Sequence, residues 1–222
     1  MYLLRLDLPE EQALSAFRGA VRALVICQGL QASLVYRLGH AVIVWEPETG
    51  GGRLLRRLAR AAHFVCARTI ESTTGIRINE RADIGPGLHI AHHGTTIIGA
   101  VTMGANATIT HSVTIGRSGR RGERATPVIG DRVWIGPGAV ITGGLHIGDD
   151  VVIGANAVVT KSLPDAAVAY GAPARIASYR GSFDQVLYAG AEDDPGRVRA
   201  VARAAERTSS TAAQEHGARS EA

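Results

Sequence analysis

Two histidines of the chain occupy equivalent positions in a repeated pattern. His92 and His111 each stand two residues after an isoleucine, Ile90 and Ile109 respectively. Histidine changes its charge near neutral pH, so such residues transfer protons in catalysis or bind metal ions. A metal site needs further ligands, and no third ligand has a matching spacing, so we expect no metal. His93 is the alternative to His92, because the register of the pattern is ambiguous there.

The elements that hold these histidines follow from a six-residue hydrophobic period. In the second half of the chain it runs without a break through Ile129, Ile135, Ile141, Ile147, Ile153 and Val159. Upstream it runs through Ile78, Ile84 and Ile90, and then through Ile97, Met103, Ile109 and Ile115. A period of six fits neither an α-helix nor an alternating strand. It is typical of a hexapeptide parallel β-helix, in which each hexapeptide forms one side of a triangular coil.

The composition fits a narrow prism with one aliphatic side chain per side. Only 5% of residues are aromatic, and 27 are glycine. Small residues at the fifth position of the hexad are expected to fill the corners: Ala107, Val113, Ala139 and Ala157. Residues one coil apart should stack about 4.8 Å from each other. His92 and His111 should then be neighbours on one face. A glycine-rich α/β domain with coincidental spacing is the alternative, which the unbroken phase disfavours.

The period is interrupted twice by extra residues. One extra residue lies within "IAHHGTTI", and eight lie within "GRSGRRGERATPV". A repeat accepts an insertion at a corner, as a loop that leaves the prism. We interpret the second loop either as a solvated excursion or as an anion-attracting flap beside an active site. It carries one acid, Glu123, and four arginines: Arg117, Arg120, Arg121 and Arg124.

The hexad divides the chain into three parts. Residues 1–75 are predicted to form a helical N-terminal region, 76–181 the β-helix, and 182–222 a partly disordered C-terminal tail. Within the tail, "PGRVRAVARAAER" predicts a short helix. The fold class is therefore expected to be α+β. The N-terminal helices are expected at about 9–29, 31–46 and 52–71.

Charge and composition exclude several classes of protein. The net charge is +4, and no aromatic-basic stripe of a nucleic-acid binder is present in the sequence. The apolar stretch "VICQGLQASLVYRLGHAVIVW" is interrupted by polar residues, so we expect no membrane span. We also expect no cleaved leader. The two cysteines fall on predicted helices, which indicates reduced thiols and a cytoplasmic protein.

The stretch from about Thr74 to Ser178 resembles the serine acetyltransferases and the wider group of hexapeptide acyltransferases. The matching segments are "TGIRINERADIGPGLHIAHHGTTIIG", "ITHSVTIG" and "TPVIGDRVWIGPGAVITGGLHIGDDVVIGANAVVTKSLPDAAVAYGAPARI". The resemblance implies a left-handed coil, an exception to the right-handed crossover rule. It also implies a homotrimer, with acetyl-CoA bound in the groove between neighbouring prisms, and a role in cysteine biosynthesis.

The resemblance also implies roles for individual residues. The family's segment G-(hydrophobic)-x-(hydrophobic)-x-H falls on residues 87–92, which makes His92 the general base. A base is needed because an alcohol is a poor nucleophile until its proton is removed. His111 and Arg124 are expected to bind the acceptor. By position, the donor surface would include Gly116, Arg117, Pro137, Gly138, Ala155, Lys161 and Arg175.

Two departures leave the acceptor open. Typical serine acetyltransferases carry Asp where this chain has Ala91, and Arg-His-Pro where it has residues 125–127, Ala-Thr-Pro. L-serine is the leading acceptor for acetyl transfer, and a sugar or natural-product hydroxyl is the alternative. A non-catalytic trimeric hexapeptide protein is a further alternative. A carbonic anhydrase of similar coil would need a third suitable histidine, which we do not find.

Two expectations concern protein partners. Val133, Trp134 and Val151 are predicted to lie in the contact between subunits of the trimer. Serine acetyltransferases that dock on a cysteine synthase end in isoleucine, whereas this sequence ends in Ala222. We therefore do not expect docking on a cysteine synthase.

Overall fold

The structure is a computed structural model that describes residues 19, 22, 24–92, 94–118 and 125–206. Two predicted N-terminal helices are present, as α2 (Gln28–Val44) and α3 (Gly50–Thr74). Their bounds agree with the predicted 31–46 and 52–71 to within three residues at each end. Most of the predicted helix at 9–29 lies outside the described residues. Within the described ranges, no helix is both long and apolar enough to cross a bilayer.

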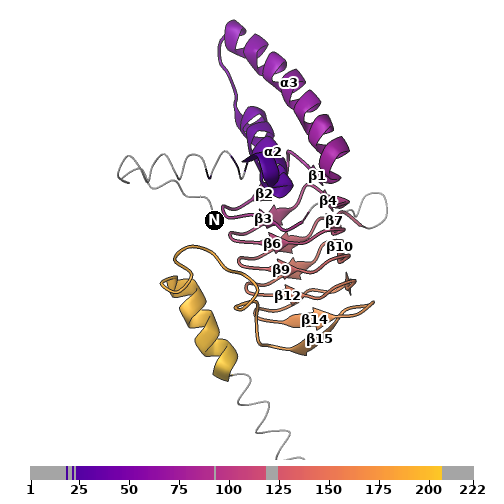
Figure 1. The fold of residues 1–222 in the computed structure, drawn as a ribbon, viewed down its shortest axis with the longest axis vertical. Helices are drawn as coiled ribbons and strands as arrows, with labels where there is room; N and C mark the ends of the chain where they lie inside the picture. The colour runs from indigo at the N-terminus through magenta and orange to yellow at the C-terminus, as the bar shows by residue number, and fades with distance from the viewer. Residues whose placement is uncertain (1–18, 20–21, 23, 93, 119–124, 207–222) are drawn as a thin grey trace, which may run out of the picture.

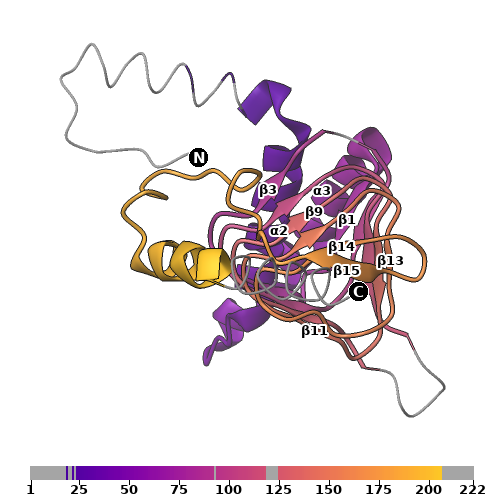
Figure 2. The same cartoon turned by 90° about the horizontal axis from the view of Figure 1, so that it is seen from below.

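The strands that follow wind into a left-handed parallel β-helix, and every third strand from β1 to β12 joins the same sheet (Figures 1 and 2). The predicted fold class is therefore confirmed. Sheet A contains β1 (Ile76–Ile78), β4 (Thr96–Ile98), β7 (Thr114–Gly116), β10 (Val140–Thr142) and β13 (Val158–Val159). Sheet B contains β2 (Asp83–Ile84), β5 (Thr102–Met103), β8 (Val128–Ile129) and β11 (His146–Ile147). Sheet C contains β3 (His89–Ile90), β6 (Thr108–Ile109), β9 (Trp134–Ile135), β12 (Val152–Ile153), β14 (Val168–Tyr170) and β15 (Arg175–Ser178).

The core is a column of stacked aliphatic side chains along the axis of the prism. All six residues of the unbroken period, from Ile129 to Val159, are buried, and so are the four small residues predicted at the corners. Successive coils pair in register, as Ile109 with Ile135 and Ile135 with Ile153. Because each inward side chain contacts those of the coils above and below, the column stabilises every coil through its neighbours.

One inward position differs from the prediction. Ile98 is 1% exposed and pairs with the inward Ile78 and Ile115, whereas Ile97 is 43% exposed and faces outward. The corner after Ile90 therefore contains two extra residues, and the next side of the coil is one residue shorter. Two adjacent isoleucines satisfy the six-residue period almost equally well, so the sequence pattern alone does not distinguish them.

The corners of successive coils stack into three edges along the prism. The His92 edge joins sheets C and A (residues 91–92, 94–95, 110–113, 136–139 and 154–157). The flap edge joins sheets A and B (residues 79–82, 99–101, 117–118, 125–127, 143–145 and 160–162). The B–C edge joins sheets B and C (residues 85–88, 104–107, 130–133, 148–151 and 164–167). The insertion predicted to leave the prism begins and ends at the flap edge, where Ser118 pairs with Ala125, and residues 119–124 between them lie outside the described residues.

Both ends of the β-helix are covered, as open sheet edges require. At the first coil, α2 packs against the core, and Tyr36 and Arg37 donate hydrogen bonds to the carbonyls of Ala82 and Ile84. A Cβ at Gly29 would lie 2.3 Å from the Ile90 carbonyl oxygen, so only glycine allows α2 to approach this closely. At the last coil, β15 pairs antiparallel with β14 and ends the parallel stack.

The predicted subunit-contact residues need a correction. Val133 and Val151 are 0% exposed, because both point into the core of their own chain at the B–C edge. They cannot contact another subunit without unfolding the coil. Trp134 faces outward from β9 and is half-buried.

The register of the first coil can be tested by a matched pair of substitutions. Ile98→Ala should lower the free energy of unfolding by about 2–5 kcal/mol, because it leaves a cavity in the core. Ile97→Ala removes the same atoms from an exposed position and should cost less than about 1 kcal/mol. Urea unfolding of both variants at one protein concentration measures the difference. An equal or larger effect of Ile97→Ala would contradict this register.

Candidate active site

The two predicted histidines lie side by side at the upper end of the His92 edge. Strands β3 and β6 pair Ile90 with Ile109, so His92 and His111 are one coil apart, as predicted. Their ring centroids are 6.1 Å apart, and the ring planes cross at 75°. His92 has φ of +67°, the corner conformation that Ser112 and Asn156 also adopt on this edge. The corner therefore turns the His92 side chain outward, where it is exposed.

His111 has an unused hydrogen-bonding atom beside His92. Its Nδ1 is buried, and no described residue forms a hydrogen bond with it. Buried polar atoms of proteins nearly always have a partner, in the protein or in water. Nδ1 of His111 is thus an unpaired polar atom beside the candidate base.

Three of the seven predicted donor-site residues continue the same edge below the histidines. The Gly138 amide donates to the His111 carbonyl at 3.1 Å, and the Asn156 amide donates to the Pro137 carbonyl at 2.8 Å. Pro137, Gly138 and Ala155 therefore follow His111 down the prism. Gly138 has φ of +72°, and a Cβ there would lie 2.1 Å from Asn156 Oδ1. Only glycine fits at position 138. Because glycine has no side chain, the His92 edge does not protrude there.

The other predicted donor-site residues are not next to this line. Gly116 at the end of β7, Arg117 and Lys161 belong to the flap edge or border it, at the opposite ends of the sheet A strands. Arg175 begins β15 below the His92 edge, where its guanidinium donates to the Ala174 carbonyl at 3.2 Å. The three cations are all exposed. One chain therefore does not bring the whole predicted donor surface together.

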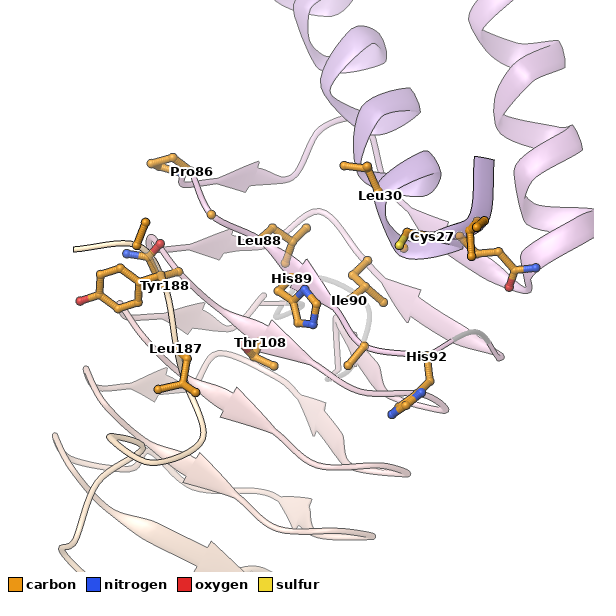
Figure 3. A pocket seen from close by; sticks show the side chains of 17 residues that line it. Cys27, Leu30, Pro86, Leu88, His89, Ile90, His92, Thr108, Leu187 and Tyr188 are labelled. Atoms are coloured by element: carbon orange, nitrogen blue, oxygen red, sulfur yellow. The ribbon is translucent and has the colours of Figure 1, made fainter. Parts of the chain in front are cut away.

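A pocket of about 940 Å³ extends from His92 across the outer face of sheet C (Figure 3). Its floor contains His89 and Thr108, which are paired neighbours on β3 and β6. The start of α2 forms one wall, with Cys27 and Leu30, and residues 187–189 form the opposite wall. Ala91 also lines the pocket. Its methyl group supplies no charge.

His89 is a pocket residue that the sequence analysis did not select. The hexad correctly predicts that it faces outward, but not that α2 and residues 187–189 enclose the space above it. Burial lowers the pKa of His89, and the nearby charge of a protonated His92 lowers it further. His89 is therefore neutral at physiological pH and acts as a hydrogen-bonding group.

The second wall of the pocket belongs to the C-terminal part of the chain, which the structure describes up to residue 206. Residues 182–197 run beside the B–C edge, and a helix follows at 195–206 (Figures 1 and 2). The Ser182 hydroxyl donates to the Arg132 carbonyl, and Arg197 donates to the carbonyls of Phe183 and Val186. The predicted short helix is thus present. The last residues of the predicted tail, 207–222, lie outside the described residues.

Asp194 holds this wall in place. Its carboxylate accepts hydrogen bonds from the Tyr188 hydroxyl and from the amides of Gly196 and Arg197, so it also caps the helix. It lies 3.8 Å from Arg132, whose guanidinium makes a two-pronged contact with the buried Asp150. Burial, with the hydrogen bond to Asp194, raises the pKa of Tyr188 to about 12, so its hydroxyl remains a donor.

Two candidate residues cannot be placed. Arg124, predicted to bind the acceptor, and His93, the alternative base, lie outside the described residues. Among the residues that are described, no group of three metal-binding side chains is close enough to hold an ion.

Comparison with known proteins identifies first the class and then the family. Residues 126–161 match the family model described as bacterial transferase hexapeptide (six repeats). The chain is 38% identical over 161 residues to serine acetyltransferase of Helicobacter pylori strain J99. The aligned region covers 72% of this chain and 87% of that protein. The chain belongs to the serine acetyltransferase family.

Solved structures of the family agree with the fold. Soybean serine acetyltransferase complexed with serine matches with a TM-score of 0.59 and 29% identity over 75% of this chain. The Brucella abortus enzyme in complex with coenzyme A matches with a TM-score of 0.56 and 28% identity over 68% of this chain. The chain spans only 63% and 56% of the lengths of these two proteins.

The attachment of the pocket wall can be tested at Asp194. Asp194→Ala should lower the free energy of unfolding by about 0.5–2 kcal/mol, the usual cost of losing a helix cap. It should also speed hydrogen exchange at the amides of Gly196 and Arg197, measured by mass spectrometry. The hydrogen bond from Tyr188 holds the pKa of Asp194 below its usual range. Its stabilising effect is therefore complete above about pH 4 and is lost as the pH falls further.

Asp193→Ala is the matched control for this variant, because Asp193 is the adjacent exposed carboxylate. It should leave both the exchange rates and the unfolding curve nearly unchanged. If the two variants behaved alike, Asp194 would not be the residue that secures the wall.

Proposed function

We propose that the protein transfers the acetyl group of acetyl-CoA to a hydroxyl group, with His92 as the general base. The observation that carries this proposal is the line formed by His92, His111 and the small residues Pro137, Gly138 and Ala155. His92 supplies a base at one end of this line, and the small residues below it leave room for an extended molecule. Membership of the serine acetyltransferase family supports the same chemistry.

The proposed reaction is a direct transfer. His92 removes the proton of the acceptor hydroxyl as its oxygen attacks the thioester carbonyl. A new C–O ester bond forms and the C–S bond breaks. The protonated His92 then returns its proton to the leaving thiolate, which gives free CoA and a neutral imidazole. The His111 side chain is assigned to the acceptor, which it would hold next to His92.

The donor is assigned to two edges that must meet between subunits. Pro137, Gly138 and Ala155 would allow the pantetheine arm to approach the backbone of the His92 edge. Arg117 and Lys161, on the flap edge, are suited to phosphate groups. Within one chain, the width of sheet A separates these two groups, so a second subunit is needed to combine them.

A trimer with sheet A facing the threefold axis would bring these edges together. Three prisms arranged in this way place the His92 edge of each against the flap edge of the next. From the second coil onward the outer face of sheet A fits such a contact, because Ile97, Thr114, Val140 and Val158 follow one another in register and are uncharged. We therefore propose a homotrimer with three shared sites, a closed heterologous assembly.

L-serine is the acceptor that the relatives suggest. The soybean serine acetyltransferase structure is a complex with serine, and the family is named for this reaction. The product, O-acetylserine, would serve cysteine biosynthesis. Serine is therefore the first acceptor to test.

The role of His92 predicts a specific kinetic change. His92→Ala should lower the turnover rate by about 10²–10⁴-fold, the usual contribution of a positioned base. The Michaelis constant for acetyl-CoA should change little, because the imidazole acts on the acceptor. Release of free CoA, followed with a thiol reagent, measures both values.

His146→Ala is the control, since this exposed histidine lies outward on sheet B, away from the pocket. It should keep the parental rate, and His111→Ala should show a smaller loss than His92→Ala. Full activity of His92→Ala together with an inactive His93→Ala would transfer the base to His93. If all three variants of His92, His93 and His111 stayed active, histidine catalysis would be refuted.

The shared site predicts complementation between two inactive variants. One variant is His92→Ala, and the other combines Arg117→Ala with Lys161→Ala. In randomly mixed trimers, about a quarter of the contacts pair an intact His92 edge with an intact flap edge. Unfolding and refolding the two variants together should therefore restore about a quarter of the parental activity. Each variant refolded alone is the control, and no gain on mixing would contradict sites shared between subunits.

A further inference from the structure

The pocket beside His92 has an unusual chemical lining for an amino-acid site. No aspartate, glutamate, lysine or arginine occurs among the described residues that line it. Apart from the proposed base His92, its polar groups are neutral, in particular Gln28, Asn106 and Thr108, together with the neutral His89. A free amino acid carries an ammonium and a carboxylate group, and burying such charges without partners is costly.

The lining instead offers hydrogen bonds on one side and apolar surface on the other. Gln28 lines the pocket, and its Oε1 atom is buried without a hydrogen-bond partner among the described residues. Thr108 and His89 lie on the floor of the pocket, as Figure 3 shows. Leu187 and Tyr188 add apolar surface, since the Tyr188 hydroxyl is already bonded to Asp194. A molecule with several hydroxyl groups and an apolar face matches this pattern.

The volume of the pocket is also large enough for a molecule of this kind. Its volume of about 940 Å³ is at the upper end of the range of about 300–1,000 Å³ that holds drug-sized ligands. None of the seven residues predicted for the donor lines the pocket. The donor line descends the His92 edge, whereas the pocket crosses sheet C on the other side of His92. The two substrates would thus reach the base from different directions.

We propose that this pocket binds an uncharged polyhydroxyl acceptor, of the size and chemistry of a neutral glycoside, and presents one of its hydroxyl groups to His92. This proposal rests on the acetyl transfer proposed above, and it extends the acceptor class beyond serine. Gln28, Thr108 and His89 would hold the hydroxyl groups. Leu187 and Tyr188 would cover the less polar face.

A matched series of sugars tests the preference for neutral acceptors. The series consists of methyl α-D-glucopyranoside and N-acetylglucosamine, which are uncharged, and glucosamine and glucuronate, which carry opposite charges. CoA release, with mass spectrometry of the acetylated product, gives kcat/KM for each sugar and for L-serine. We expect kcat/KM for each neutral sugar to exceed kcat/KM for either charged sugar by at least about tenfold. Equal or better use of either charged sugar would overturn the proposal.

Substitutions in the pocket test its location. Thr108→Val and Gln28→Ala should each raise the Michaelis constant for the neutral sugar about 3- to 10-fold, the usual effect of one lost hydrogen bond. Thr102→Val is the matched control, because Thr102 has the equivalent outward position on β5 of sheet B. It should have no effect. If Thr108→Val also left the Michaelis constant for the neutral sugar unchanged, the sugar would not lie in this pocket.

Binding measured without acetyl-CoA separates the two proposals. Saturation-transfer NMR with methyl α-D-glucopyranoside should detect binding that Thr108→Val weakens and Thr102→Val does not. Binding with no CoA release from any acceptor would refute the acetyl transfer and leave the neutral pocket standing. Turnover of L-serine that depends on His92, with no binding or turnover of neutral sugars, would refute the neutral pocket and leave acetyl transfer standing.

Discussion

The interior of the prism accepts one aliphatic side chain per side of each coil, and the rest of the structure depends on this constraint. Residues at the inward positions are fixed by contacts with the coils above and below, so they cannot also serve chemistry. The outward positions and the corners remain. Because corners of successive coils stack at nearly constant spacing, residues far apart in sequence form straight lines on the surface. His92, His111, Pro137 and Ala155 belong to one such line.

The two covered ends of the β-helix have different relations to the site. At the last coil, the antiparallel strand β15 ends the stack, and it adds only Arg175 to the residues considered for the donor. At the first coil, α2 covers the core and also forms a wall of the pocket, with Gly29 allowing the close approach. The opposite wall comes from the C-terminal segment, held by Asp194 and Arg132. The pocket therefore exists because two segments outside the repeat meet beside its first coil.

The sequence predicts the repeated part of the molecule well and the parts outside it poorly. A six-residue period defines which side chains point inward, so the core from Ile129 to Val159 and the pairing of His92 with His111 could be derived. Ile97 was misplaced because two adjacent isoleucines fit the period and only pairing with Ile78 selects Ile98. Val133 and Val151 were assigned to a subunit contact, although their hexad position turns them inward. Leu187 and Tyr188 were missed because no periodic signal links residues 182–197 to the first coil.

The position of Tyr188 in the chain has a consequence for how the protein is made. The floor of the pocket is complete once Thr108 has been synthesised, but its second wall follows 80 residues later. At the usual 5–20 residues per second, the delay is about 4–16 s on the ribosome. The coils can stack during this time, since each needs only its neighbours. A growing chain therefore presents His92 on an open surface, and the enclosed pocket arises only after residues 187–189 have been synthesised.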